Sequence, residues 1–464
     1  MKRINAFILL TMLAIAACAP KSSSNKGFRK PYDSLTAVLV TEGLRDGQAF
    51  AMLENLTKNV GTRLSGSEGA SKGVEWAQAN MERLGFDTTW LEPVMVPHWV
   101  RSNTERAQIT RHQSGKRPAL KITALGGTIG TPDGGIEAEV VEVHSFEELQ
   151  SMGDRAKGKI VFFNRPMDPT KFYPGEAYGG AVNQRTSGAS EAARAGGLAA
   201  LVRSMTMRLD DNPHTGAMRY NDSLPKVPTA AVSTIGANLL SEMLKQDPHM
   251  KVKLELGCQI LPDVESFNVI GEYRGTALPN DVVLIGGHLD SWDIGEGAHD
   301  DGAGVVHCLE AVRLLKNQNL RPKRTIRVVL FMNEENGLKG AKAYAAVSRP
   351  GTKHVAAIET DAGGFSPRSF SSDADSIAFP KLKKLEWVLV PMDMNVVKGH
   401  SGADISQLIA HGVPTIGLRP DYHRYFDHHH SAMDVLENVH PRELELGAVA
   451  MAAFAYALAE EGLN

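Results

Sequence analysis

Apolar runs alternate with amphipathic stretches along the C-terminal part of the chain, from residue 266 onward. The run 282–285 is wholly apolar, which is typical of a strand buried on both faces. Apolar spacing predicts further strands at 325–331, 355–359 and 414–418, and helices at 302–316, 341–348, 403–410 and 441–460. Strands that alternate with helices predict an α/β fold, here a mostly parallel mixed sheet with helices on both faces.

Two other patterns precede this region. Residues 35–84 are expected to be largely helical, because their apolar residues recur at three- and four-residue steps. From 120 to 260, glycine and short β-like runs dominate, and few residues with metal-binding side chains occur. We therefore predict a main domain made of 35–119 and 261–464, interrupted by an inserted β-rich domain at 120–260.

The first residues have the pattern of a secretory signal peptide. A basic start precedes a mostly apolar stretch of about fourteen residues, which is too short to span a bilayer comfortably. Cys18 follows small residues, as in a bacterial lipobox, so we predict a lipoprotein-type signal peptide at 1–18 and a lipid anchor on Cys18. The serine-rich stretch 19–34 is then a tether. We expect export to the periplasmic or cell-surface side, in the lipidated form as an outer-membrane lipoprotein.

The bulk composition adds few constraints. A net charge of −3 over 464 residues gives no reason to expect a nucleic acid or an anionic membrane as a partner. The hydrophobic fraction of 42% is ordinary for a soluble globular protein. Besides Cys18, only Cys258 and Cys308 are present, too few for a disulfide framework. Cys308 lies in an apolar run and is expected to be buried.

Polar residues with metal-binding side chains follow four of the predicted strands. In an open α/β sheet, ligands bind beyond the C-terminal ends of the strands, so these residues should meet at one edge. One such placement is expected by chance, but four are not. In chain order they are His288, the pair Glu334 and Glu335, Asp361, and the run His428, His429 and His430, with Asp300 just downstream of the first.

Together these side chains suffice for two zinc ions. Zinc prefers nitrogen and oxygen ligands, and two ions roughly 3.5–4 Å apart can share a carboxylate and a water. Asp300 is expected to bridge the metals, and Glu334 is left as general base and acid. The terminal ligands are then His288 and Asp361 for one zinc, and Glu335 with one of His428, His429 or His430 for the other.

Two further carboxylates are close in sequence to the histidine ligands. Asp290, two residues after His288, is expected to accept the far imidazole N–H and so fix the tautomer. Asp434, four residues after His430, is expected to do the same for that histidine.

At this point the motifs resemble those of a known family. They are similar to the co-catalytic zinc exopeptidases of the aminopeptidase / glutamate carboxypeptidase group, and within it to the carboxypeptidase Q branch. The likeness covers most of the mature chain. The matching motifs are GHLDSWD at 287–293, DDGAG at 300–304, NEE at 333–335, ETDAG at 359–363, RPKRT at 321–325 and PHTG at 213–216.

The resemblance implies roles for individual residues. Its metal ligands carry over to His288, Asp300, Glu335, Asp361 and, by the spacing to Asp434, His430, with Glu334 as general base. Val435 follows Asp434 where the family usually has threonine, which leaves His429 open against His430. The resemblance also implies a cis peptide bond between Asp300 and Asp301 and a protease-associated insert, and it allows a homodimer.

The expected activity is that of a zinc aminopeptidase or dipeptidase, which hydrolyses peptide bonds near a free terminus. A water that bridges the metals would be the nucleophile, with Glu334 as its general base. Three alternatives stay open. A carboxypeptidase needs a basic pocket for the substrate carboxylate, for which Arg419, Arg424 and Lys398 are the nearest candidates. A glutaminyl-cyclase-like enzyme would hold one zinc, and a receptor-like homologue would lack ligands, of which none is missing.

Overall fold

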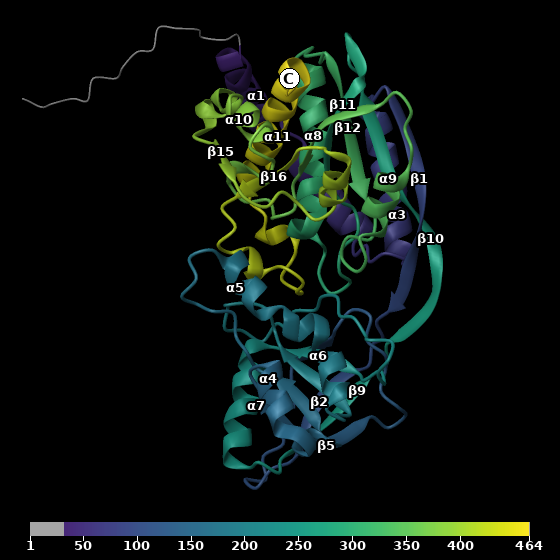
Figure 1. Cartoon of the computed structure of the whole chain (residues 1–464), viewed down its shortest axis with the longest axis vertical. Helices are drawn as coiled ribbons and strands as arrows, with labels where there is room; N and C mark the ends of the chain where they lie inside the picture. Colours follow the sequence, from purple (N-terminus) through teal and green to yellow (C-terminus); the bar gives the residue numbers. More distant parts are fainter. Residues whose placement is uncertain (1–31, 464) are drawn as a thin grey trace, which may run out of the picture.

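The computed structural model describes residues 32–463 and places their strands in two eight-stranded sheets. Figure 1 shows the first sheet with its helices in the upper part of the molecule and the second sheet below it. The arrangement is the mixed α/β fold that the strand and helix pattern predicts.

The first sheet is mixed, with four adjacent parallel strands at its centre. Strands β12, β11, β13 and β16 run parallel to one another. Toward the edges, β1 pairs antiparallel with β10, β10 with β12 and β14 with β16, whereas β15 pairs parallel with β14. In spatial order the strands are β1 (Thr88–Val100), β10 (Gln259–Tyr273), β12 (Arg324–Phe331), β11 (Leu278–His288), β13 (Lys353–Glu359), β16 (Thr415–Pro420), β14 (Pro367–Ser372) and β15 (Asn395–Lys398).

Helices cover both faces of this sheet. On one face lie α1 (Tyr32–Asp46), α2 (Ala49–Asn55), α3 (Glu68–Arg83), α8 (Ala303–Asn317) and α11 (Pro441–Glu461). The other face packs against α9 (Lys339–Ala346) and the 3-10 segment Ile405–His411. A short helix, α10 (Ala378–Lys383), lies near β15.

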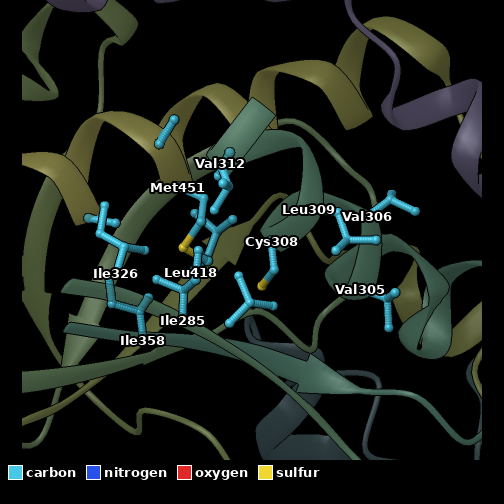
Figure 2. Close-up of a cluster of buried hydrophobic side chains, with 14 of the residues drawn as sticks. Ile285, Val305, Val306, Cys308, Leu309, Val312, Ile326, Ile358, Leu418 and Met451 are labelled. Atoms are coloured by element: carbon cyan, nitrogen blue, oxygen red, sulfur yellow. The ribbon is translucent and has the colours of Figure 1, made fainter. Parts of the chain in front are cut away.

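The apolar strands are buried on both sides, as their composition predicts. Val283 and Ile285 of β11 pack into the core beneath α8 and α11, whereas Leu284 packs beneath α9. Cys308 of α8 is fully buried in the first of these cores, as its apolar surroundings predict. Figure 2 shows this layer, with labelled side chains from the strands, from α8 and from Met451 of α11.

Helix α3 illustrates how the sequence sets a helix boundary. The side chain of Ser67 accepts a hydrogen bond from the backbone N–H of Ala70 and so caps the N-terminus. Glu68 in the first turn and Arg83 in the last complement the helix dipole. The buried face then packs this helix beside β10 and β1.

The second sheet starts earlier in the chain than the change in composition at residue 120 suggests. Strand β2 (Glu105–Arg111) pairs antiparallel with β9 (Lys251–Leu256), which the local sequence of β2 does not reveal. The other strands, in spatial order around this pair, are β3 (Ala119–Leu120) and then β5 (Ile136–Val143), β6 (Ile160–Phe163), β7 (Ala199–Arg203), β8 (Thr229–Val232) and β4 (Ile122–Ala124). Its helices are α4 (Phe146–Met152), α5 (Pro174–Ala181), α6 (Asn183–Arg194) and α7 (Thr234–Gln246).

The two parts share packed residues. Phe365, Tyr425 and Phe426, from loops of the first part, belong to the same buried cluster as Ala177 and Ala181 of α5. In Figure 1, α5 lies at the junction between the two sheets. This contact sets the second sheet against the loops that follow β13 and β16.

The predicted signal peptide, Cys18 and most of the predicted tether lie outside the described residues. Helix α1 begins at Tyr32, so the last residues assigned to the tether are helical. Among the helices of residues 32–463, none has both the length and the apolar character needed to cross a membrane.

Candidate metal centre

The metal-binding side chains meet where the four parallel strands end. His288 is the last residue of β11, the Glu334–Glu335 pair follows β12, and Asp361 follows β13. The histidine run lies on the loop after β16. Because these strands are neighbours and parallel, their C-terminal ends share one edge of the sheet, as the sequence predicts.

Asp300 lies between His288 and His430. Its Oδ1 is 3.2 Å from Nε2 of His288, and its Oδ2 is 3.3 Å from Nε2 of His430. Asp361 approaches His288 from one side, with 3.7 Å between its Oδ1 and Nε2. Glu335 approaches His430 from the other, with 3.0 Å between its Oε2 and Nε2. One carboxylate thus faces two separate groups of ligand atoms.

His430 and His429 are not equivalent in this arrangement. Nε2 of His429 is 3.8 Å from Oδ2 of Asp300, farther than His430, and no contact between His429 and Glu335 is found among the described residues. The two rings stack with centroids 3.5 Å apart. The distances favour His430 as the ligand, in agreement with its spacing to Asp434.

The donor atoms fit a pair of metal ions. Three buried atoms, Nε2 of His288, Oδ2 of Asp300 and Oε1 of Glu335, have no hydrogen-bond partner among residues 32–463. Leaving buried polar atoms without partners is costly, so such a cluster indicates a missing ligand. The ligand atoms of Asp300, His429 and His430, and those of His288, Asp300 and Glu335, lie within 4.8 Å of one another.

Asp301 plays a different part from Asp300. The peptide bond between the two residues is cis, as the family resemblance implies. Oδ2 of Asp301 accepts the backbone N–H of His288 at 3.0 Å, and its Oδ1 accepts that of Gly304 at 3.0 Å. Its carboxylate is therefore committed to backbone groups, whereas that of Asp300 faces the two histidines.

The structure differs from the sequence prediction for Asp290. Nδ1 of His288 donates to the backbone carbonyl of Asp290 at 2.9 Å rather than to its carboxylate. The carboxylate instead accepts the backbone N–H groups of Glu334 at 3.0 Å and Glu335 at 3.4 Å. Residue 290 still fixes the tautomer of His288, and its side chain holds the loop after β12 in place.

Asp434 also differs from its predicted role. Its Oδ1 accepts the backbone N–H of His299 at 2.6 Å, and its Oδ2 accepts that of Asp300 at 3.2 Å. Burial raises the pKa of this carboxyl to about 7, with the charge of Asp300 acting in the same direction. Asp434 therefore positions the backbone of Asp300, and no hydrogen bond between its carboxylate and the ring of His430 is found among the described residues.

Glu334 is half-buried beside the ligands, and no side-chain hydrogen bond is found for it within the described residues. Burial raises its pKa well above the usual range. The charge of His288 acts in the opposite direction, whereas the charges of Asp361 and Glu335 raise the pKa further. A raised pKa helps a carboxyl group to hold a proton as well as to release it, as a general base and acid must.

Arg63 is a buried positive charge beneath the acidic residues, which sequence reasoning did not identify. It is fully buried and donates to the backbone carbonyls of Leu289, Glu296 and Gly297. Burial lowers its pKa to about 10, while the charges of Asp434 and Asp290 act in the opposite direction. The guanidinium thus holds the loop from β11 to Asp300.

Two other histidines of this region are engaged elsewhere. His299 accepts the backbone N–H of Gly364 with Nδ1 and donates from Nε2 to the carbonyl of Asn438. Its ring stacks on Phe365 with centroids 4.4 Å apart. His428 contacts the carbonyl of Met433 through Nδ1. Neither belongs to a ligand cluster within residues 32–463.

The second sheet brings an unexpected cation to the site. Arg185 of α6 is buried, and its Nη1 lies 3.3 Å from Nδ1 of His430. Its guanidinium lies 5.4 Å from the ring of Tyr178 in α5, which in turn contacts the ring of His429. No carboxylate of residues 32–463 forms an ion pair with Arg185, and its Nε has no partner there. Nothing in the local sequence of α6 indicates this role.

The three basic residues that the sequence analysis named for binding a substrate carboxylate are less suited to that role than Arg185. Arg419 donates to the hydroxyl of Ser371 and to the carbonyl of His400, so it braces a loop. Lys398 donates to the carbonyl of Ala374. Arg424 lies over the ring of Phe365 at 5.3 Å.

The sequence model of peptidase family M28 matches residues 268–455. The chain is 37% identical to carboxypeptidase Q of Mus musculus over 424 residues, which cover 91% of this chain and 88% of that protein. Carboxypeptidase Q of Homo sapiens is also 37% identical, over 91% of this chain and 87% of its own.

Solved structures give the same picture. A peptidase M28 precursor from Shewanella amazonensis SB2B has a TM-score of 0.89 at 35% identity and covers 93% of this chain and 98% of its own. BSAP, a zinc aminopeptidase from Bacillus subtilis, has a TM-score of 0.66 at 17% identity, over 89% of this chain and 95% of its own. The second likeness concerns the fold alone.

Proposed function

Because this chain belongs to peptidase family M28, we propose that it is a two-zinc exopeptidase that hydrolyses dipeptides. Membership confirms the family that the motifs predicted and makes the chain a peptidase. The observation that carries the narrower proposal is the ligand cluster around Asp300 together with the unpaired Arg185 beside it. The ligand cluster accounts for the chemistry, and Arg185 accounts for the choice of substrate.

The proposed zinc ligands are those that the sequence named. His288 and Asp361 would hold one ion, Glu335 and His430 the other, and Asp300 would contact both. When bound, the ions supply polarisation of the scissile carbonyl and a lowered pKa of the attacking water. The name of the similar zinc aminopeptidase BSAP supports zinc as the metal.

Glu334 is the residue we assign to proton transfer. Its carboxyl group lies next to the ligands, carries a raised pKa and has no side-chain partner within the described residues. In the proposed reaction it removes a proton from the attacking water and later delivers a proton to the leaving amine. The carboxylate of Asp290 fixes the position of Glu334, because it accepts a hydrogen bond from the backbone N–H of Glu334.

Arg185 supports recognition of a free C-terminus. A buried charge without a partner is costly, and a guanidinium matches a carboxylate in a bidentate pair. The substrate carboxylate would lie on the His430 side of the centre. The acidic side chains around Asp361, which is 21% exposed, offer negative charge for the free ammonium group at the other end. A substrate that satisfies both ends near one scissile bond is a dipeptide.

The test is a comparison of substrates that differ only at their ends. We expect free dipeptides to be cleaved in the presence of zinc, and both N-acetylated and C-amidated dipeptides to be cleaved much more slowly. Loss of all cleavage on chelation, with recovery on adding zinc, would support the metal assignment. Equal cleavage of C-amidated and free dipeptides would contradict the role of Arg185.

A carboxypeptidase is the second candidate, because Arg185 would suit it equally well. Rapid cleavage of N-acetylated substrates with a free C-terminus would select this alternative. A single bound zinc per chain would instead favour the alternative of a glutaminyl-cyclase-like enzyme. Export, lipidation of Cys18, a homodimer and the protease-associated nature of the second sheet stay predictions.

A further inference from the structure

We propose that three residues of the second sheet region, His214, Thr215 and Gly216, are positioning residues that hold His430 in its place at the metal centre. We call these three residues the brace. The inference rests on the proposed function, in which His430 is a zinc ligand. It assigns the inserted part of the chain a structural role in the metal centre itself, beyond any contact with substrate.

The backbone conformation of His430 is disfavoured, so contacts from elsewhere in the chain must stabilise it. Its φ of 61° lies in the left-handed region, which is uncommon for residues other than glycine. It sits on a long loop after β16, between the 3-10 turn at Tyr425–Asp427 and the turn closed by Ser431. A residue in a disfavoured conformation on a loop stays there only when its surroundings fix it.

The brace supplies two hydrogen bonds to this loop from a distant part of the chain. The backbone N–H of Thr215 donates to the carbonyl of His430 at 2.8 Å. Nδ1 of His214 donates to the carbonyl of His429 at 2.7 Å. Consecutive carbonyls of the two histidines are therefore held from one side, and all four residues are buried.

Gly216 allows the brace to come this close. Its φ is 132°, and a Cβ added there would lie 2.7 Å from Nδ1 of His430 and 2.4 Å from Nη1 of Arg185. Any larger residue would push against the imidazole of the proposed ligand. The absence of a side chain at this position is thus part of the geometry of the site.

The brace is itself anchored in the second sheet. The hydroxyl of Thr215 donates to the carbonyl of Ala124 in β4 at 2.8 Å. The backbone N–H of His214 donates to the hydroxyl of Ser204, just after β7, at 2.9 Å. The carbonyl of Gly216 accepts from the N–H of Gly126 at 3.0 Å. The second sheet therefore fixes the position of the brace, and the brace fixes that of His430.

Cobalt(II) titration of the purified full chain tests the brace without relying on activity. Cobalt reports occupancy and geometry through its visible absorption, and a competing chelator gives the affinity. We expect wild type to bind two ions, and Gly216→Ala to bind one of them about 10- to 100-fold more weakly with an altered spectrum, the range typical of lost outer-shell support. Gly180→Ala is the matched control, since a Cβ at this α5 glycine meets nothing within 4 Å.

His214 provides a second test that does not depend on whether Gly216→Ala folds. His214→Leu removes the donor to the carbonyl of His429, and we expect it to weaken the same ion about tenfold. His214→Asn places an amide N–H close to the position of Nδ1, and we expect it to restore wild-type binding. Thermal unfolding of each variant checks that the fold is retained.

The outcomes separate the brace from the proposed function. Two tightly bound ions in wild type, with unchanged affinity and spectrum in Gly216→Ala and His214→Leu, would overturn the brace alone. Fewer than two ions in wild type would contradict the two-metal function and the brace with it. Weakened binding in both variants, restored by His214→Asn, supports the brace.

Discussion

Arg185 and His430 lie far apart in the sequence, yet Nη1 of Arg185 is only 3.3 Å from Nδ1 of His430. The contact joins helix α6 of the second sheet to the loop after β16 in the first. It places a guanidinium with no carboxylate partner among residues 32–463 directly beside a proposed zinc ligand. In the proposed function, the carboxylate of the substrate is the partner of this guanidinium.

Replacing Arg185 with methionine should weaken binding of free dipeptides. The loss of a hydrogen-bonded charge pair is worth about 1.5–3 kcal/mol, so kcat/KM should fall about 10- to 100-fold. C-amidated dipeptides, which lack the carboxylate, should be affected much less. Steady-state kinetics on both substrates measures the difference. Arg194→Met on the same helix is the control, because Arg194 pairs only with Glu191 at the surface among the described residues.

Asp434→Asn should disturb the metal centre without removing a ligand. The amide can accept one of the two backbone N–H groups of residues 299 and 300, and its NH₂ group opposes the other. An unsatisfied buried donor costs about 1–3 kcal/mol of unfolding free energy. We expect about tenfold weaker metal binding as well. Urea unfolding and chelator competition check both effects, and wild-type values in both would rule out this role.

The strand ends and the metal-binding side chains beside them could be predicted from the sequence because both are local. An apolar run fixes where β11 or β12 ends. His288 is the last residue of β11, and Glu335 comes four residues after the end of β12. In a parallel sheet, adjacency of the strand ends then follows from topology. The partners of Asp290 and Asp434 could not be predicted, because their carboxylates bind backbone groups whose positions depend on loop conformation.

Residues that reach the site from distant parts of the sequence were also beyond sequence reasoning. Arg185 and Arg63 carry no motif of their own, and each reaches the site only through tertiary packing. Strand β2 shows the same limit for the fold, since its place in the second sheet depends on pairing with β9 more than a hundred residues later. Local patterns specify elements, while long-range contacts specify which elements meet.

Glu445 should make the stability of the protein depend on pH. Burial raises the pKa of this carboxyl to about 7, and the nearby Glu310 acts in the same direction. A pKa raised in the folded state means that folding favours the proton, so stability is highest below the unfolded pKa and falls as pH rises toward about 7. The effect has an upper limit of about 3 kcal/mol.

Glu445→Gln mimics the protonated side chain and can still accept the backbone N–H of Phe50. We expect the variant to be more stable than wild type at pH 8 and nearly equal to it at pH 5. Chemical unfolding of both proteins across this range measures the difference. A difference that stays constant with pH would show that Glu445 does not titrate as described.

The measurement that most directly tests the central claim is metal content and turnover of Glu334→Gln side by side. If Glu334 transfers the proton and is not a ligand, the variant should keep two zinc ions per chain while kcat falls about 100- to 10,000-fold. Loss of a metal ion from the variant, or turnover close to that of wild type, would contradict the assignment.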